Sequence, residues 1–336
     1  MNRFSYDRAA DVAQALAAHR STGTAFLAGG TNLVDLVKEG VTRPEKIIDI
    51  RRLPLRDIQE TAEGGLKVGA LATNSAVAYH PEIMRRYPLV AESILSGASP
   101  QIRNVATIGG NLLQRTRCVY FYDTGTPCNK REPGTGCPAI AGVNRMHAIF
   151  GASEHCIAVH PSDLCVALAA LDAVVHVSGP QGERALPFAQ FHRLPDDTPH
   201  IDTNLGDHEL STSVELPNEG FASHHAYLKV RDRASYAFAL VAVAVGLALE
   251  GNVVREVRCA LGGVAHKPWR NRDAEDMLRG KPLTPQSVRD FANEVVRDAH
   301  GYRHNAFKIE LTTRAIMRAF QQASQRDLGA QSEVQP

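Results

Sequence analysis

Long apolar runs are scarce in this sequence. The longest, from Ala237 to Leu249, has 13 residues, whereas a helix that crosses a bilayer needs about 20. The first seven residues, Met1 to Asp7, have neither the apolar core of a signal peptide nor a twin arginine. We therefore expect no membrane insertion. We also expect the chain to be cytoplasmic, or to reach the periplasm only by co-export with a signal-bearing partner.

A surplus of charge of one sign is also missing. Lys and Arg number 37 against 36 Asp and Glu, so the net charge is +1, and nothing in the composition points to nucleic acid or anionic lipid as a partner. Hydrophobic residues at 44% and charged residues at 22% are typical of a soluble globular protein. The length of 336 residues exceeds what one small core can organise, which predicts two or three domains.

Cysteine is too rare for a disulfide framework, and reduced thiols are expected. There is no C-x-x-C pair, which argues against a zinc ribbon. Four of the six cysteines nevertheless share one Pro- and Gly-rich segment, with nine, eight and eighteen residues between neighbours: Cys118, Cys128, Cys137 and Cys156. A loop of about 40 residues without a core of its own is either disordered or held by something. An iron–sulfur cluster on four cysteines would hold it, but by spacing alone reduced structural thiols or zinc explain the segment equally well. Cys165 and Cys259 have apolar neighbours and are expected in the core.

The known nucleotide fingerprints are absent as well, because neither G-x-G-x-x-G nor G-x-x-x-x-G-K-[ST] occurs. Two other glycine turns are present, Gly29-Gly30-Thr31-Asn32 and, about 80 residues later, Thr107-Ile108-Gly109-Gly110-Asn111. Glycine lets backbone N–H groups close on a phosphate, and a helix start favours an anion. Either turn alone is equally well a tight turn with an Asn cap. As a pair, they could clamp the two phosphates of one dinucleotide.

Hydrophobic periodicity predicts an alternating α/β unit in the first 60 or so residues and a mixed organisation afterwards. We expect helices over 11–19, 33–37, 90–95, 285–299 and 311–322, and one that Ser162 caps and that runs through Leu171. Strands are expected at 26–27, 47–50, 66–68, 173–177 and 210–216, with a buried element over 237–249.

Two charged residues have both an ordinary and a functional interpretation. Asp163 could cap the helix that begins beside it, or accept a hydrogen bond from a cofactor. Lys229 lies in a mixed-charge run, which is usually a solvated face, but a lysine beside a flavin would stabilise the reduced anion. The 14 histidines show no H-E-x-x-H or similar spacing, and we interpret them as ordinary.

Taken together, these segments resemble the FAD-binding (medium) subunits of the molybdenum hydroxylases, the xanthine dehydrogenase family. Residues 26–33 and 103–112 resemble the two FAD-pyrophosphate loops of the family, and 160–164, Lys229 and 261–265 follow in the family's order. The resemblance spans about residues 1–322. The cysteine segment is similar to that in the FAD subunits of periplasmic aldehyde oxidoreductases, which carry a [4Fe–4S] cluster. The hydroxybenzoyl-CoA reductase type, with differently spaced cysteines, ranks second.

The resemblance implies an α+β fold. Two subdomains of the vanillyl-alcohol-oxidase/PCMH type, 1–57 and 58–223, would share one FAD, with the cluster insert at about 115–157. A C-terminal α+β domain with a small antiparallel sheet would follow over 224–324, then a tail over 325–336. The residues that would bind FAD are Phe26, Leu27, Ala28, Gly29, Gly30, Thr31, Asn32, Leu33, Thr107, Gly110, Asn111, Asp163 and Lys229. The cluster ligands would be Cys118, Cys128, Cys137 and Cys156.

The implied function is electron transfer within a molybdenum-dependent aldehyde oxidoreductase. A large subunit with the molybdenum cofactor would oxidise the aldehyde to the carboxylic acid, and a [2Fe–2S] small subunit would pass electrons to the FAD on this chain. An external acceptor would then take them from the flavin. The cluster would relay electrons or hold the insert, and we favour the structural role. The alternatives are a xanthine dehydrogenase-like or hydroxybenzoyl-CoA reductase-like complex, a stand-alone flavin oxidase, and a colourless zinc or scaffold module.

Overall fold

The computed structural model describes residues 2–21 and 23–325, and its N-terminal part is a small parallel α/β unit. Strands β1, β3 and β2 lie side by side in that order, and helices α1 and α2 make the crossovers. The bounds are β1 Ser5–Arg8, α1 Val12–Ala18, β2 Thr24–Leu27, α2 Leu33–Lys38 and β3 Lys46–Asp49. Asp11 caps α1 by accepting from Gln14 N at 2.7 Å. The alternating pattern predicted for this region is confirmed.

The middle part is an antiparallel sheet with strand order β4-β5-β8-β6-β7. Its long connection from β5 to β6 carries seven helices of the described chain. The strands are β4 Ile58–Glu60, β5 Leu66–Gly69, β6 Val174–Gly179, β7 Gly182–Pro187 and β8 Leu210–Leu216. The helices of this part are α3 Asn74–Ala78, α4 Pro81–Arg86, α5 Pro88–Ser96, α6 Pro100–Arg103, α7 Ile108–Leu112, α8 Val119–Tyr122, α9 Asp163–Ala170 and, after β7, α10 Phe188–Phe191.

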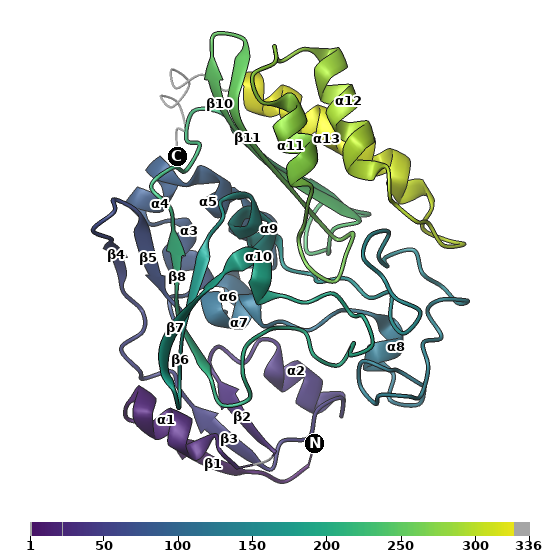
Figure 1. Cartoon of the computed structure of the whole chain (residues 1–336). Helices are drawn as coiled ribbons and strands as arrows, with labels where there is room; N and C mark the ends of the chain where they lie inside the picture. The colour runs from purple at the N-terminus through teal and green to yellow at the C-terminus, as the bar shows by residue number, and fades with distance from the viewer. Residues whose placement is uncertain (1, 22, 326–336) are drawn as a thin grey trace.

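A third sheet, with order β12-β11-β10-β9, forms the C-terminal part. Helices α12 and α13 cover one face of this sheet, and α5 and α9 of the middle part pack against the opposite face (Figure 1). The apolar run over 237–249 becomes the central strand β10, which is buried along most of its length because both of its faces are covered. The bounds are β9 His225–Val230, β10 Val241–Glu250, β11 Val253–Gly262, β12 Trp269–Arg270, α11 Arg272–Leu278, α12 Pro285–Val296 and α13 Phe307–Gln325.

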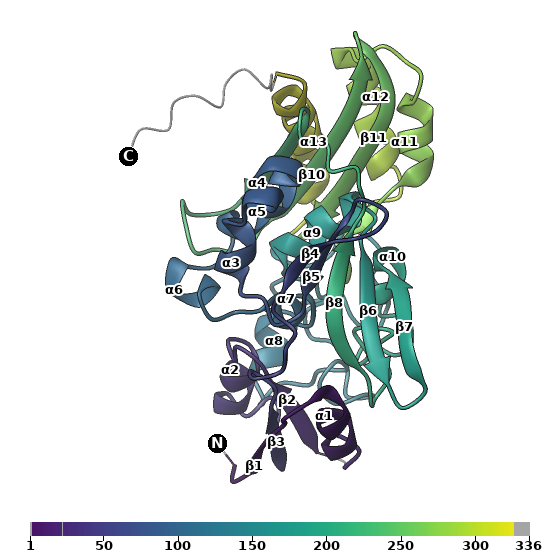
Figure 2. The same cartoon turned by 90° about the vertical axis from the view of Figure 1, so that its left-hand side faces the viewer.

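The three parts are arranged in a column, with the five-stranded sheet and its helices between the N-terminal unit and the C-terminal sheet (Figures 1 and 2). No helix in residues 2–21 and 23–325 is both long and apolar enough to span a bilayer. Of the predicted tail, residues 326–336 lie outside the described residues.

The cysteine segment runs from α7 to α9 as a long excursion with one short helix, α8 (Figure 1). Phe121 of this helix is buried against Leu36 of α2 and Cys128. Arg117 forms an ion pair with Asp35 at 2.8 Å, which also ties the segment to α2. The segment is therefore anchored on the N-terminal unit, although it follows α7 of the middle part in the sequence.

Candidate cofactor-binding cavity and cysteine site

A cavity of about 760 Å³ lies where the three parts meet, since its lining residues come from α2, the helices of the middle part, the cysteine segment and the third sheet. Six of the predicted FAD contacts line it: Thr31, Asn32, Gly110, Asn111, Asp163 and Lys229. The remaining predicted contacts do not line it and instead build the turns around it: Phe26, Leu27, Ala28, Gly29, Gly30, Leu33 and Thr107. Tertiary structure thus brings together residues up to 198 positions apart.

The first glycine turn connects the end of β2 to α2. An ideal Cβ on Gly29 would lie 2.2 Å from the carbonyl oxygen of Val105. Only glycine therefore lets this turn contact the residues that precede the second glycine turn. Gly30 has a φ of +73°, the left-handed region that glycine adopts without strain. Within the described residues, the N–H groups of residues 29–32 donate no hydrogen bond. They remain available to a ligand.

Asn32 does not cap its helix, so this part of the tight-turn interpretation is wrong. Its Oδ1 accepts instead from the backbone N–H of Arg115 at 3.1 Å, at the start of the cysteine segment. Its Nδ2 is buried and has no partner among the described residues. An orphaned buried donor is costly, and the residue that carries it lines the cavity.

The second turn begins helix α7, and the backbone N–H groups of residues 108–111 are already used. Thr107 Oγ1 accepts from Gly110 N at 3.2 Å, and Gly109 N donates to Ala70 O at 2.8 Å. The N–H of Ile108 also donates to a backbone carbonyl, and that of Asn111 to Thr107 O. This turn therefore presents the Asn111 side chain and the Gly110 surface to the cavity, in contrast to the open N–H groups of the first turn.

Asp163 and Lys229 form a buried ion pair on the cavity wall. Lys229 Nζ lies 2.7 Å from Asp163 Oδ2, with side chains 5% and 9% exposed. The hydroxyl of Tyr227 donates to Asp163 Oδ1 at 2.7 Å. Burial raises the pKa of Asp163, although Lys229 and Tyr227 act in the opposite direction. The solvated-face interpretation of Lys229 is wrong, and the capping interpretation of Asp163 fails because Ser162 Oγ accepts from Cys165 N and caps α9 itself.

The four clustered cysteines line one small second cavity. All six cysteines in the described part of the chain are free thiols. A hydrogen bond with Cys156 lowers the pKa of Cys137, which favours a thiolate at this site. His147 Nε2 lies 3.1 Å from Cys118 Sγ. Cys165 and Cys259 are buried elsewhere, and burial raises the pKa of Cys165 to about 12, so their assignment to the core is confirmed.

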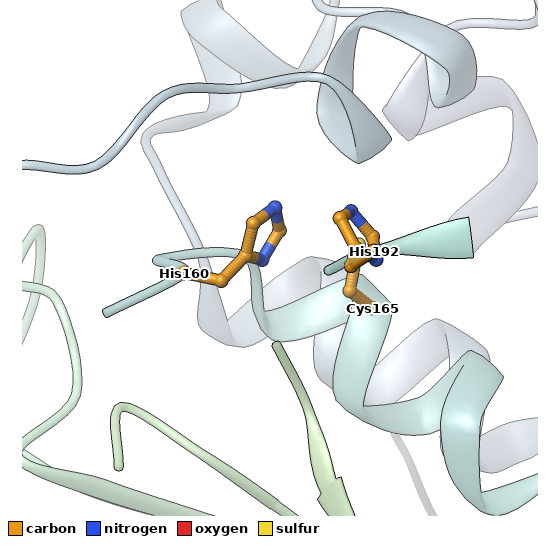
Figure 3. Close-up of side chains that lie close together, drawn as sticks. All are labelled: His160, Cys165 and His192. Carbon is orange, nitrogen blue, oxygen red and sulfur yellow. The ribbon is translucent and has the colours of Figure 1, made fainter. Parts of the chain in front are cut away.

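His160, Cys165 and His192 lie close together in the core, a grouping that the sequence did not reveal because no regular spacing links them (Figure 3). The Nε2 atoms of His160 and His192 lie 3.3 and 2.9 Å, respectively, from the carbonyl oxygen of Leu112. His160 Nδ1 also accepts from the N–H of Ser162 at 3.4 Å. Burial lowers the pKa of His192 to about 4, so its ring is neutral. Because three of the four ring nitrogens are engaged, we interpret the pair as a cap on the C-terminus of α7.

Fold and cavity together define a three-part protein with a large cavity where its three sheets meet. A family model described as "FAD binding domain in molybdopterin dehydrogenase" matches residues 2–219, and one described as "CO dehydrogenase flavoprotein C-terminal domain" matches residues 225–323. The chain belongs to the family of FAD-binding medium subunits of the molybdenum hydroxylases.

Individual relatives agree with this assignment. The aldehyde oxidoreductase FAD-binding subunit PaoB of Escherichia coli is 47% identical, over 94% of this chain and 96% of that protein. The glyceraldehyde dehydrogenase medium chain of Sulfolobus acidocaldarius is 29% identical, over 93% and 97%. In the structure of carbon monoxide dehydrogenase from Hydrogenophaga pseudoflava, a chain with 25% identity superposes with a TM-score of 0.76 over 97% of this chain and 99% of that one. The α+β fold expected from the sequence is confirmed.

Proposed function

We propose that this chain is the FAD-carrying electron-transfer subunit of a molybdenum-dependent aldehyde oxidoreductase. The observation that carries the proposal is the 47% identity, over nearly the whole of both chains, to an aldehyde oxidoreductase FAD-binding subunit. The chain has no aldehyde chemistry of its own in this proposal. It is the outlet through which electrons from the aldehyde leave the complex for an external acceptor.

Two features of the large cavity fit FAD. Its volume of about 760 Å³ lies in the range of cofactor sites, roughly 300–1,000 Å³. The N–H groups of Thr31 and Asn32 donate no hydrogen bond within the described residues and belong to residues that line the cavity, so they would supply donors for the pyrophosphate. Asn111 would add a side-chain contact from the second turn, and the Asp163–Lys229 pair would contact the adenosine or flavin portion. A bound flavin can accept electrons singly and pass them on as a pair.

The four-cysteine cavity fits an iron–sulfur cluster better than zinc. With Zn–S distances of about 2.3 Å, two sulfurs on one zinc ion lie at most about 4.6 Å apart. Among the described residues, the one group of three or more ligand atoms within 4.8 Å of one another is His160, Cys165 and His192. No three of the sulfurs of Cys118, Cys128, Cys137 and Cys156 therefore lie that close together, although Cys137 and Cys156 share a hydrogen bond, and the four are not gathered around a single ion. Four thiolates around a larger body are the ligand set of a [4Fe–4S] cluster.

The proposal includes two partners and an internal division of the chain. A large subunit with the molybdenum cofactor and a small [2Fe–2S] subunit would complete a heterotrimer, alone or as a dimer of it. The structure of a carbon monoxide dehydrogenase that contains a similar chain supports such an assembly. The sheets over 5–49, 58–216 and 225–270 support our division of the chain near residues 57 and 223.

The test is a cofactor inventory of the chain purified with its co-expressed partners. We expect one FAD and about four iron atoms with matching acid-labile sulfide per chain. Cys128→Ser should lose the iron and keep the FAD. Cys165→Ser, a buried cysteine outside the small cavity, is the matched control and should keep both. Flavin without iron in the unmodified protein would refute the cluster, and the absence of both groups would refute the function.

A further inference from the structure

Two residues belong to the walls of both cavities. Cys118 and His147 line the large cavity that we assign to FAD and also the small cavity with the four cysteines. Whatever occupies the two cavities is therefore separated by this pair of side chains.

The pair is joined directly. His147 Nε2 lies 3.1 Å from Cys118 Sγ, and the histidine is only 5% exposed. Its Nδ1 has no partner among the described residues. A metal-bound thiolate sulfur can only accept, so the proton must be on Nε2 when Cys118 is a cluster ligand. The contact is then an N–H···S hydrogen bond that points at the cluster from the flavin side.

The position of His147 is fixed from outside the cysteine segment. Its carbonyl oxygen accepts from Lys308 Nζ at 2.8 Å and from Asn305 Nδ2 at 3.2 Å, and its N–H donates to Asn144 O. Lys308 is fully buried on α13 and also donates to Gly263 O. The C-terminal part thus fixes the position of the His147 imidazole. A group that tunes a metal site needs such rigid support.

We propose that His147 is a positioning residue that donates an N–H···S hydrogen bond to the cluster ligand Cys118 and thereby raises the reduction potential of the cluster on the side that faces the flavin. The inference rests on the proposed function, because it requires a cluster on the four cysteines. Its physical basis is that reduction adds negative charge, which spreads onto the ligand sulfurs. A hydrogen-bond donor stabilises that charge, and hydrogen bonds to the sulfurs are among the factors that set the potential.

The first test is a redox titration of the cluster, followed by electron paramagnetic resonance, in the complex with its partner subunits. His147→Phe removes the donor and should shift the midpoint potential to a more negative value with about four irons retained. His147→Gln keeps an N–H at similar reach and should restore most of the shift. His224→Gln is the matched control, since His224 lines neither cavity and its Nδ1 lies 3.2 Å from Ala323 O, and it should leave the potential unchanged. An unchanged potential in His147→Phe would overturn the proposal.

A second measurement needs no variant of His147. In the unmodified complex labelled with ¹⁵N-histidine, pulsed electron paramagnetic resonance of the reduced cluster should detect one coupled histidine nitrogen and an exchangeable proton. The absence of that coupling would overturn the hydrogen bond even if His147→Phe fails to assemble. If the unmodified protein holds FAD but no iron, the cluster itself is refuted, and the iron assay separates that result from a missing hydrogen bond.

Discussion

Replacement of Lys229 by Met tests the buried ion pair in the large cavity. At 2.7 Å between Lys229 Nζ and Asp163 Oδ2, the attraction is about 6 kcal/mol for an effective dielectric constant of about 20. Much of it offsets the cost of taking both charges out of water, since burial still leaves the pKa of Asp163 raised. Removal of one partner, however, leaves the other charge buried and costs about 3–5 kcal/mol. We expect Lys229→Met to lower the free energy of unfolding by that amount.

The dependence on pH gives this prediction a second signature. Without Lys229, the folded-state pKa of Asp163 should rise further, so the folded protein binds more protons than the unfolded one. The contribution of Asp163 to the stability of the variant should then be largest below the ordinary Asp pKa of about 3.9 and decline as the pH rises through the folded-state pKa. The destabilisation relative to the unmodified protein should therefore be smaller at pH 5 than at pH 8.

The assay is urea unfolding at several pH values, on protein with and without added FAD. Lys67→Met is the matched control, because Lys67 is an exposed lysine on β5, and it should change stability by less than about 0.5 kcal/mol. The double variant Lys229→Met/Asp163→Asn removes both charges and should recover much of the loss. A loss below about 1 kcal/mol in Lys229→Met, or a double variant as unstable as the sum of the two single variants, would refute the reasoning.

Two further substitutions test the elements around the cavity. Gly29→Ala places a Cβ against the Val105 carbonyl. It should lower the free energy of unfolding by roughly 1–3 kcal/mol and weaken FAD binding in a fluorescence titration. In the control Gly125→Ala, the new Cβ meets only a movable side chain, and both stability and FAD binding should stay unchanged. His192→Leu removes one donor from the Leu112 carbonyl and a group whose folded-state pKa is lowered to about 4 by burial. A lowered histidine pKa contributes stability that is lost as the pH falls from about 6.5 towards 4. In urea unfolding, the stability of this variant should therefore depend less steeply on pH in that window. An unchanged dependence of stability on pH would contradict the role of His192 as a buried neutral histidine.

The histidine cap and the ion pair have a common consequence for the cavity. His160 and His192 hold the end of α7, and Lys229 of β9 holds the start of α9 through Asp163. The second glycine turn and the first turn of α9 are therefore fixed by residues from outside their own helices. A cavity with walls positioned in this way loses little freedom when a cofactor binds, which favours tight binding.

The amino-acid sequence alone determined the local elements and the chemistry available to the site. Asp11 and Ser162 mark helix starts that the structure has, because a side-chain oxygen one position before a helix satisfies a free N–H whatever the rest of the chain does. The apolar run over 237–249 fixed the position of the buried strand β10. The unusual glycine turns and the grouping of four cysteines were likewise visible, because each is a short-range pattern.

Only the tertiary structure decided which of these residues meet. Asn32 faces Arg115, 83 residues away, instead of its own helix. Lys229 is buried on Asp163, 66 residues away, although its neighbours in the sequence are typical of a solvated surface. His147 joins Cys118 and stands between two cavities, and no periodicity or spacing marks it. Such pairings depend on how three sheets pack against one another, and desolvation and long-range charge pairing arise only once they have done so.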